Sequence, residues 1–410
     1  MLYILHKPVV ILGAARTAHA LLGGSLERYS ATALGAFAIK GALGRAGIAA
    51  DTVDECIMGN VVSAGLKQSP AKQAAVAAGI PHDRLFKTVN TVCGSGMSAI
   101  QDACMSLGAG ISRIVVAGGM ESRSNAPYYL GPFDDAKERL PGKVRGFELR
   151  IKSPGRGASV SEYVEFLKKL RLSGIHEASI HDSLMCPFAD GLSMKDYAAK
   201  YAEETGMSVD EVNSSARLSY SKARDAQAAG DLAREITPAG DVEEDEIISP
   251  EREADYRAIS YGFVTAYNAP QLADGAAALV LACQDTAERL GLRPLARIVA
   301  ISRVDTEPAA FVTAPVEVVR IAMEVSHRPV TIIEANESFA LQQPLLRAAF
   351  GEVEMNPYGG AVALGHPVGA SGARVVVTLV NAMRQKSHAT GVATICFGSG
   401  GAMAALVERV

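Results

Sequence analysis

One cysteine of this 410-residue chain stands where a thiol can act as a nucleophile. Cys93 follows an apolar run and precedes Gly94, and the apolar spacing after Ser98 predicts a helix. Free backbone N–H groups and the helix dipole at such a helix start favour the thiolate over the thiol. The segment therefore fits a nucleophilic cysteine, and it also fits a small buried cysteine in a tight strand-to-helix turn.

An imidazole, a second thiol and an amide stand in similar surroundings. His366 lies in a segment with five glycines, ahead of a predicted helix. Histidine is a natural base for activating a thiol, although a lone histidine is commonly structural or exposed. Cys396 is followed by Gly398, which can present a backbone N–H. Asn336 follows an apolar strand pattern, where its amide can orient a water molecule or cap a turn.

The elements that must position these residues alternate between strand and helix. Short apolar runs are followed by helical patterns, which is typical of layered α/β folds with buried strands. Open α/β sheets bind ligands at the carboxyl ends of their strands, so we expect the candidate residues to meet there. The predicted strands include Val9–Leu12, Glu55–Met58, Ile114–Ala117, Leu279–Ala282, Ile332–Glu334 and Val392–Phe397.

Two stretches of the chain follow one plan. The pattern over Thr88–Leu107 predicts a strand, a glycine-rich turn and a helix, and the strand Arg113–Gly119 comes next. The pattern over Ala361–Met383 predicts a glycine-rich turn and a helix, and the strand Gly391–Phe397 comes next. This similarity favours a duplicated α/β fold.

The middle of the chain, residues 122–261, is more irregular and more charged than the rest. We interpret it as an inserted, partly helical subdomain. Ser208 and Glu211 have the spacing of a helix start, and the helix is predicted to end before Gly230. The basic stretch Lys137–Arg156 fits a solvated loop or an oligomer contact, and it also fits a site for an anionic phosphate group.

Composition excludes several classes of protein. At about 150 residues per domain, the length predicts two to three domains. Forty Lys and Arg against 44 Asp and Glu leave a net charge of −4, which argues against a nucleic-acid partner. No apolar run is long enough to span a membrane, and neither end resembles a targeting signal, so we expect a cytoplasmic protein. The six cysteines lack the spacing of a disulfide framework, and no metal site is predicted.

The motifs taken together resemble the thiolase family over nearly the whole chain. The Cys93, Asn336, His366 and Cys396 segments occur in the order that this family has. Further matching segments are Ala15-Arg16-Thr17, Gly24-Ser25-Leu26, Met58-Gly59-Asn60-Val61, Gly65 through Gln73, Gly118-Gly119-Met120-Glu121-Ser122, the helix with Ser219, Lys222, Ala223, Gly230 and Pro238, and Asp274-Gly275-Ala276-Ala277.

The resemblance implies an α/β thiolase fold, with two similar five-stranded mixed layers and a loop domain over the active site. We expect the first half at residues 1–121 plus 262–282, the inserted loop domain at 122–261 and the second half at 283–410. The resemblance also implies a homodimer or a homotetramer.

The resemblance further implies an acyltransferase of fatty acid metabolism. It would cleave a 3-oxoacyl-CoA with CoA, or catalyse the reverse Claisen condensation. His366 would withdraw the proton of Cys93, which would form an acyl-enzyme, and Cys396 would exchange the α-proton of the acetyl unit. The enolate would be held by His366 and an Asn336-bound water, and the acyl oxyanion by the N–H groups of Cys93 and Gly398. CoA would be a substrate or product, and no cofactor would be bound permanently.

The segments that contact CoA in this family depart from its usual pattern. A His-Met-Gly run reads Ser193-Met194-Lys195, and Phe311 begins the segment where Met-Gly-x-Gly-Pro is usual. A tyrosine replaces glycine at position 267, where we expect its phenol to narrow the pantetheine tunnel. The expected CoA and substrate contacts are Ser193, Met194, Ala266, Tyr267, Ser338 and Phe339.

These departures keep two alternatives open. One is an acyltransferase of the same fold that uses another acceptor or a carrier-protein-linked donor. The other is a non-catalytic protein that binds acyl groups or lipids, which the four complete active-site motifs disfavour.

Overall fold

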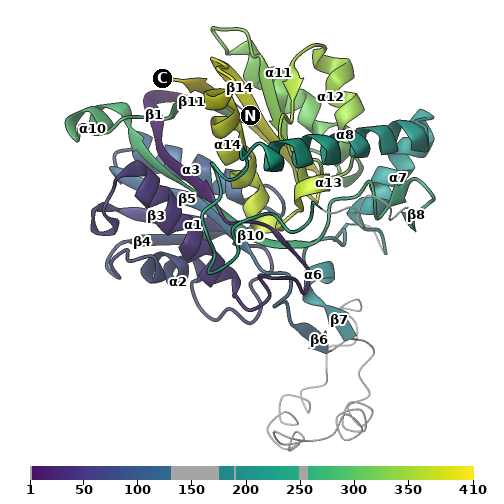
Figure 1. Ribbon diagram of the computed structural model, residues 1–410, viewed down its shortest axis with the longest axis horizontal. Helices are drawn as coiled ribbons and strands as arrows, with labels where there is room; N and C mark the ends of the chain where they lie inside the picture. The colour runs from purple at the N-terminus through teal and green to yellow at the C-terminus, as the bar shows by residue number, and fades with distance from the viewer. Residues whose placement is uncertain (1, 131–174, 189–190, 249–256) are drawn as a thin grey trace, which may run out of the picture.

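One mixed β-sheet runs through both halves of the chain in the computed structural model, which describes residues 2–130, 175–188, 191–248 and 257–410 (Figure 1). Its strand order is β13-β12-β14-β15-β11-β1-β10-β5-β3-β4, and β2 pairs with β10 beside this path. The first half supplies β1 (Leu2–Arg16), β2 (Ala20–Leu21), β3 (Glu55–Gly59), β4 (Leu85–Val89), β5 (Ile114–Glu121) and β10 (Ala273–Cys283). The second half supplies β11 (Ala296–Asp305), β12 (Ile332–Ala335), β13 (Glu354–Met355), β14 (Thr390–Cys396) and β15 (Gly401–Arg409).

The two halves repeat one topology. Each half contributes five strands to this order, apart from β2. When the five are numbered 1 to 5 in chain order, both halves have the order 3-2-4-5-1 from the edge of the sheet to its middle. In each half the second strand pairs parallel with the third and the fourth, while the other pairings are antiparallel. The halves join where β1 pairs antiparallel with β11. This confirms the prediction of two similar mixed α/β halves.

Helices cover both faces of the first half of the sheet. On one face lie α1 (Ala31–Ala46) and α2 (Pro70–Ala77), and on the other lies α3 (Ser95–Gly108). The corresponding helix of the second half, α14 (Val368–Gln385), packs against α3 and against strands of both halves (Figure 1). The remaining helices of the two halves are α10 (Gln284–Arg289), α11 (Ala314–Glu324), α12 (Gln342–Phe350) and α13 (Ala361–Leu364), with 3-10 turns at Ala50–Thr52 and Pro308–Val312.

Strands buried on both faces account for the continuous apolar runs in the sequence. In β1, the side chains of Val9 and Ile11 enter the large central core, whereas those of Val10 and Leu12 enter the core under α1 and α2. Successive side chains of a strand point to opposite faces, so one apolar run can contribute to two cores.

Glycines let α3 and α14 approach each other closely. An added Cβ on Gly96 would lie 2.5 Å from the backbone nitrogen of Ala373. An added Cβ on Gly372 would lie 2.5 Å from the backbone nitrogen of Met97. Any side chain at these positions would therefore push the two helices apart.

The chain between β5 and β10 forms a separate group of elements. They are β6 (Tyr128–Leu130), β7 (Ile175–Glu177), α6 (Ala178–His181), α7 (Met194–Thr205), α8 (Val209–Ala228), β8 (Ala258–Ser260) and β9 (Val264–Thr265). As predicted, Ser208 caps α8 by accepting a hydrogen bond from the N–H of Glu211. β8 and β9 pair with each other on either side of residue 261, the predicted end of the insertion. The basic stretch Lys137–Arg156 lies outside the described residues.

Among the described residues, no helix is both long enough and apolar enough to span a membrane.

Candidate active site

Cys93 lies in a tight turn between β4 and α3. Its predecessor, Val92, has a φ of 48°, in the left-handed region that branched side chains rarely adopt. Ser95 braces this turn, because its hydroxyl donates to the carbonyl of Val92 at 2.6 Å and accepts the N–H of Thr91 at 2.9 Å. The turn places the Cys93 side chain at the start of α3 and on the wall of a cavity.

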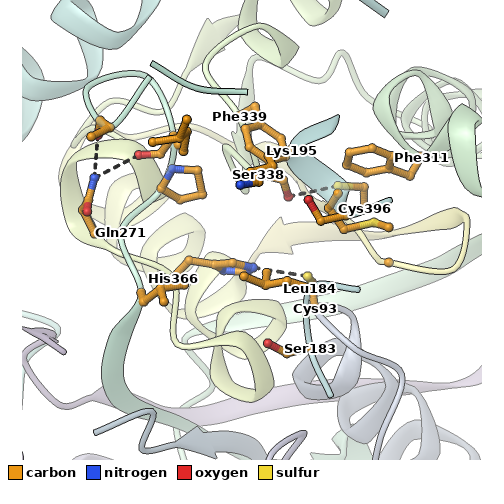
Figure 2. A pocket seen from close by; sticks show the side chains of 18 of the residues that line it. Cys93, Ser183, Leu184, Lys195, Gln271, Phe311, Ser338, Phe339, His366 and Cys396 are labelled. Atoms are coloured by element: carbon orange, nitrogen blue, oxygen red, sulfur yellow. Dashed lines mark hydrogen bonds between the residues drawn. The ribbon is translucent and has the colours of Figure 1, made fainter. Parts of the chain in front are cut away.

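His366 reaches the same cavity from the second half of the chain. It lies between α13 and α14, and its backbone N–H donates a hydrogen bond to the carbonyl of Gln271 at 2.9 Å. Its Nε2 lies 3.2 Å from the Sγ of Cys93 (Figure 2). Cys93 and His366 thus occupy matching places, each just ahead of the central helix of its half.

Hydrogen bonds indicate which nitrogen of His366 carries the proton. The hydroxyl of Ser371 donates to the carbonyl of Pro367 at 3.0 Å, and its oxygen lies 2.7 Å from the Nδ1 of His366. Since that hydroxyl proton is already used, the oxygen accepts from an Nδ1–H. The neutral ring therefore presents an unprotonated Nε2 to the thiol of Cys93.

Both members of this pair are uncharged at neutral pH. Burial is the main cause that raises the pKa of Cys93 to about 12, and the nearby Cys396 adds to it. The N–H of Gly398 and the positive charge of Arg123 act in the opposite direction. Burial, together with the charges of Arg123 and Arg374, lowers the pKa of His366 to about 3. The thiolate that the sequence favours is therefore not the resting form, because burial outweighs the helix start. His366 is instead suited to take the proton as the sulfur attacks.

Cys396 ends β14, and its sulfur contacts two polar side chains. The Sγ of Cys396 lies 2.9 Å from the Oγ of Ser338 and 3.3 Å from the Nε2 of Gln342. Burial raises the pKa of Cys396, while the hydrogen bonds with Ser338 and Gln342 act against this rise. Cys396 is therefore a buried thiol with two polar neighbours at its sulfur.

Asn336 follows β12 and lies behind these groups. Its Nδ2 donates to the Oγ of Ser338 at 3.1 Å, and its Oδ1 accepts from Arg374 at 3.2 Å. Asn336 does not line the cavity, so it reaches the site through Ser338.

The cavity has a volume of about 280 Å³, and side chains from both halves and from the inserted segment line it (Figure 2). Nine residues predicted from the sequence line it together: Cys93, Ser193, Met194, Ala266, Ser338, Phe339, His366, Cys396 and Gly398. Phe311, whose segment departs from the family pattern, also lines it. One wall is thus catalytic in character, and much of the remainder is apolar.

Tyr267 lies elsewhere, contrary to expectation. Its ring is buried and stacks on that of Tyr220 in α8, with 5.5 Å between the ring centroids. Stacking on a buried aromatic partner directs the phenol away from the cavity, so the side chain does not narrow it.

Arg123 was not singled out from the sequence, although it follows a matching glycine-rich segment directly. Arg123 is 1% exposed, and its guanidinium donates to the carbonyl of Ser179, while Nε and Nη1 lack a hydrogen-bond partner among the described residues. Its charge acts on both Cys93 and His366, favouring the thiolate of the first and the neutral ring of the second. Arg123 thus favours both the nucleophile and the base in their reactive forms.

Metal ligands are not gathered anywhere in the described residues: no group of His, Cys, Asp and Glu there can hold a metal ion. The cavity wall carries two thiols and one imidazole, those of Cys93, Cys396 and His366. Such a set is suited to acyl transfer through a cysteine.

Comparison with known protein families gives two matches that together cover nearly the whole chain. The family described as "Thiolase, N-terminal domain" matches residues 9–285. The family described as "Thiolase, C-terminal domain" matches residues 292–409.

Individual relatives agree with these matches. An acetyl-CoA acetyltransferase of Escherichia coli is 37% identical, over 98% of this chain and 100% of the relative. One from Schizosaccharomyces pombe is 36% identical, over 99% of this chain and 100% of the relative. The Acat5 thiolase of Ascaris suum, solved in complex with coenzyme A, has a TM-score of 0.84 at 32% identity, covering 98% of this chain and 100% of that one. Human mitochondrial 3-ketoacyl-CoA thiolase, also solved with CoA, has a TM-score of 0.84 at 28% identity, covering 99% of each chain.

Proposed function

This chain belongs to the thiolase family, and on that premise we propose that Cys93 accepts the acyl group in its reaction. The protein is an acyltransferase of the thiolase type. The observation that carries the assignment is the 3.2 Å contact between the Sγ of Cys93 and the Nε2 of His366, in a cavity that Cys396 also lines. It supports a thiol activated by a neutral imidazole.

The acylation step follows from this contact. As the sulfur attacks the carbonyl carbon of the thioester, the proton of Cys93 passes to the Nε2 of His366. The carbonyl oxygen then becomes an oxyanion. When the carbonyl re-forms, the bond to the CoA sulfur breaks and the departing sulfur takes the proton from His366. The N–H groups of Gly398 and of Cys93 itself both act to lower the pKa of the Cys93 thiol, which supports their role as donors to that oxygen. One such donor is typically worth about 3 kcal/mol of transition-state stabilisation.

The carbon–carbon step needs a second base. We assign it to Cys396, which lines the same cavity as Cys93 and His366 (Figure 2). In the synthetic direction its sulfur removes a proton from the α-carbon of an acetyl thioester. The resulting enolate attacks the acyl carbon on Cys93, the bond between that carbon and the sulfur breaks, and the released Cys93 sulfur takes up the proton that Cys396 removed. In thiolysis the same groups act in reverse order.

The proposed substrates are acyl-CoA thioesters with short acyl groups. Relatives that align over nearly their whole length are named acetyl-CoA acetyltransferase, and two structural neighbours were solved with CoA. The small cavity, with Met194, Phe311 and Phe339 on its walls, suits a short apolar acyl group. The relatives give no support to a carrier-protein-linked donor.

We also propose that the enzyme is a homodimer or a homotetramer. β4 is the last strand of the sheet on its side, and Leu85 at its start is 51% exposed. An edge strand of this kind is available for pairing with a second copy.

Cleavage of acetoacetyl-CoA by CoA to two acetyl-CoA tests the proposal. The wild-type protein should catalyse it and should gain one acetyl group on Cys93, detected by mass spectrometry. The Cys93→Ala variant should lose both the acetyl group and the activity, because no thiol remains to accept the acyl group. Full thiolysis by this variant would rule out the proposed role of Cys93.

A further inference from the structure

We propose that Ser338, together with Gln342, is a positioning residue that holds the sulfur of Cys396 ready to act as a base. The inference rests on the proposed roles of Cys93 and Cys396. It concerns the hydroxyl of Ser338, which lies 2.9 Å from the sulfur of Cys396.

The orientation of the Gln342 amide is determined by the backbone. The Oε1 of Gln342 accepts the N–H of Ser338 at 3.0 Å, which leaves the Nε2 facing the sulfur of Cys396 at 3.3 Å. All three residues are buried. Gln342 therefore donates to the sulfur whether or not Cys396 carries its proton.

The hydroxyl of Ser338 is directed to the same sulfur. Arg374 donates to the Oδ1 of Asn336, so the Nδ2 of Asn336 faces Ser338 and donates to its Oγ at 3.1 Å. With one lone pair of this oxygen used, the remaining contact of the hydroxyl is the Sγ of Cys396 at 2.9 Å (Figure 2). The chain Arg374–Asn336–Ser338 thus ends on the thiol.

The bond between Ser338 and Cys396 can reverse without movement of heavy atoms. In the thiol form, the S–H of Cys396 donates to the Oγ of Ser338. In the thiolate form, the hydroxyl of Ser338 rotates and donates to the sulfur. The thiolate then has two donors, Ser338 and Gln342, and the thiol has one. This difference favours the thiolate and opposes the effect of burial.

The proton balance of the step is simple. The thiolate of Cys396 takes a proton from the α-carbon of the acetyl thioester, so a C–H bond breaks and an S–H bond forms. The electron pair of the C–H bond remains on the enolate. Ser338 turns back to accept the new S–H proton, and the pair is reset when that proton passes to the released Cys93 sulfur or, in the exchange reaction, to solvent.

Few other charges act on this sulfur. Cys93 and His366 line the cavity that Cys396 lines, and Arg374 lies behind Asn336 with its ion-pair partner Glu334 at 2.6 Å. Burial lowers the pKa of His366 and raises that of Cys93. Once Cys93 is acetylated it no longer titrates. A rise of the proton-exchange rate with pH in the acetylated enzyme therefore reports on Cys396.

The test is the pH dependence of deuterium exchange into the methyl group of acetyl-CoA, measured in the wild type and in Ser338→Ala. Loss of one hydrogen bond to a charged group should move the rise in rate to higher pH by about one pH unit. Exchange at a fixed pH below the rise should then be about tenfold slower. Acetylation of Cys93, followed by mass spectrometry, should keep its wild-type rate.

Three further variants complete the experiment. Ser338→Thr retains the hydroxyl and should restore the wild-type profile. Gln342→Met removes the other donor and should also move the rise to higher pH, which tests the proposal if Ser338→Ala does not fold. Ser98→Ala is the matched control, because this buried hydroxyl donates to the non-titrating Sδ of Met403 at 3.3 Å. Its profile should not change.

The possible failures are distinguishable. An unshifted profile in Ser338→Ala, with acetylation intact, would overturn the role of Ser338. Absence of acetylation in the wild type would instead overturn the proposed role of Cys93.

Discussion

At the scale of single residues, chemistry at this site depends on where protons lie. Ser371 holds a proton on the Nδ1 of His366, so the Nε2 is free to accept the proton of Cys93. Burial keeps both partners neutral, and Arg123 favours the form of each that reacts. Proton transfer must therefore accompany the attack on the carbonyl, because the buried site stabilises no ion pair beforehand.

A test of this arrangement is Ser371→Ala. Without an acceptor at Nδ1, a fraction of the rings will carry the proton on Nε2 and cannot act as a base. We expect acetylation of Cys93 to slow by about tenfold to a hundredfold, which corresponds to roughly 1–3 kcal/mol for a buried hydrogen bond. Rapid-quench measurement of acetyl-enzyme formation checks this. Ser371→Thr should retain most of the rate, and an unchanged rate in Ser371→Ala would show that another group selects the tautomer.

At the scale of elements, two helices bring the nucleophile and the base together. Cys93 precedes α3 and His366 precedes α14, and the two helices touch at Gly96 and Gly372. The backbones of α3 and α14 are so close at these two glycines that neither position has room for a side chain. The helix contact therefore controls the distance between the two catalytic groups, although neither glycine contacts them.

Gly372→Ala tests this control of distance. The new Cβ would meet the backbone nitrogen of Met97 at 2.5 Å, so the helices must separate. We expect a loss of about 1–3 kcal/mol in the free energy of unfolding and a slower acetylation of Cys93. Gly108→Ala, at the end of α3 with no atom within 4 Å of its new Cβ, is the matched control. If both variants were equally active and equally stable, the contact would not set the distance.

At the scale of the whole molecule, a buried ion cluster ties separate parts of the chain together. Arg16 of β1 binds Asp245 with two bonds of 2.7 Å and Glu235 at 2.6 Å, and Glu235 also accepts a hydrogen bond from Thr378 of α14. Burial acts to raise the pKa of Asp245, but the charge of Arg16 outweighs burial and holds this pKa below its ordinary value. The stability that this carboxylate contributes is therefore complete above about pH 3.8 and is lost as the pH falls through its lowered pKa.

Replacement of Arg16 by leucine should affect the entire fold. The change leaves two buried carboxylates without their partner, which we expect to cost about 3–5 kcal/mol in the free energy of unfolding at neutral pH. Urea denaturation followed by circular dichroism measures it. The exposed pair of Arg28 and Asp241 offers the comparison, and Arg28→Leu should cost less than about 1 kcal/mol. Equal effects of the two substitutions would contradict this role for the cluster.

Local sequence determined the segments that carry the chemistry and the general plan of the fold. Apolar runs, glycine-rich turns and helix starts act over a few residues. The turn at Cys93, the cap at Ser208 and the repeated strand–turn–helix pattern were therefore all readable from the sequence. The resemblance of the motifs added the identity of the family.

The tertiary structure alone decided how these segments act on one another. Tyr267 faces Tyr220 rather than the cavity, burial makes Cys93 a resting thiol, and Ser338 and Gln342 meet at the sulfur of Cys396. Each of these outcomes depends on groups brought together from distant parts of the chain. Side-chain direction, desolvation and hydrogen-bond partners are properties of that packing, and a local pattern of residue types does not contain them.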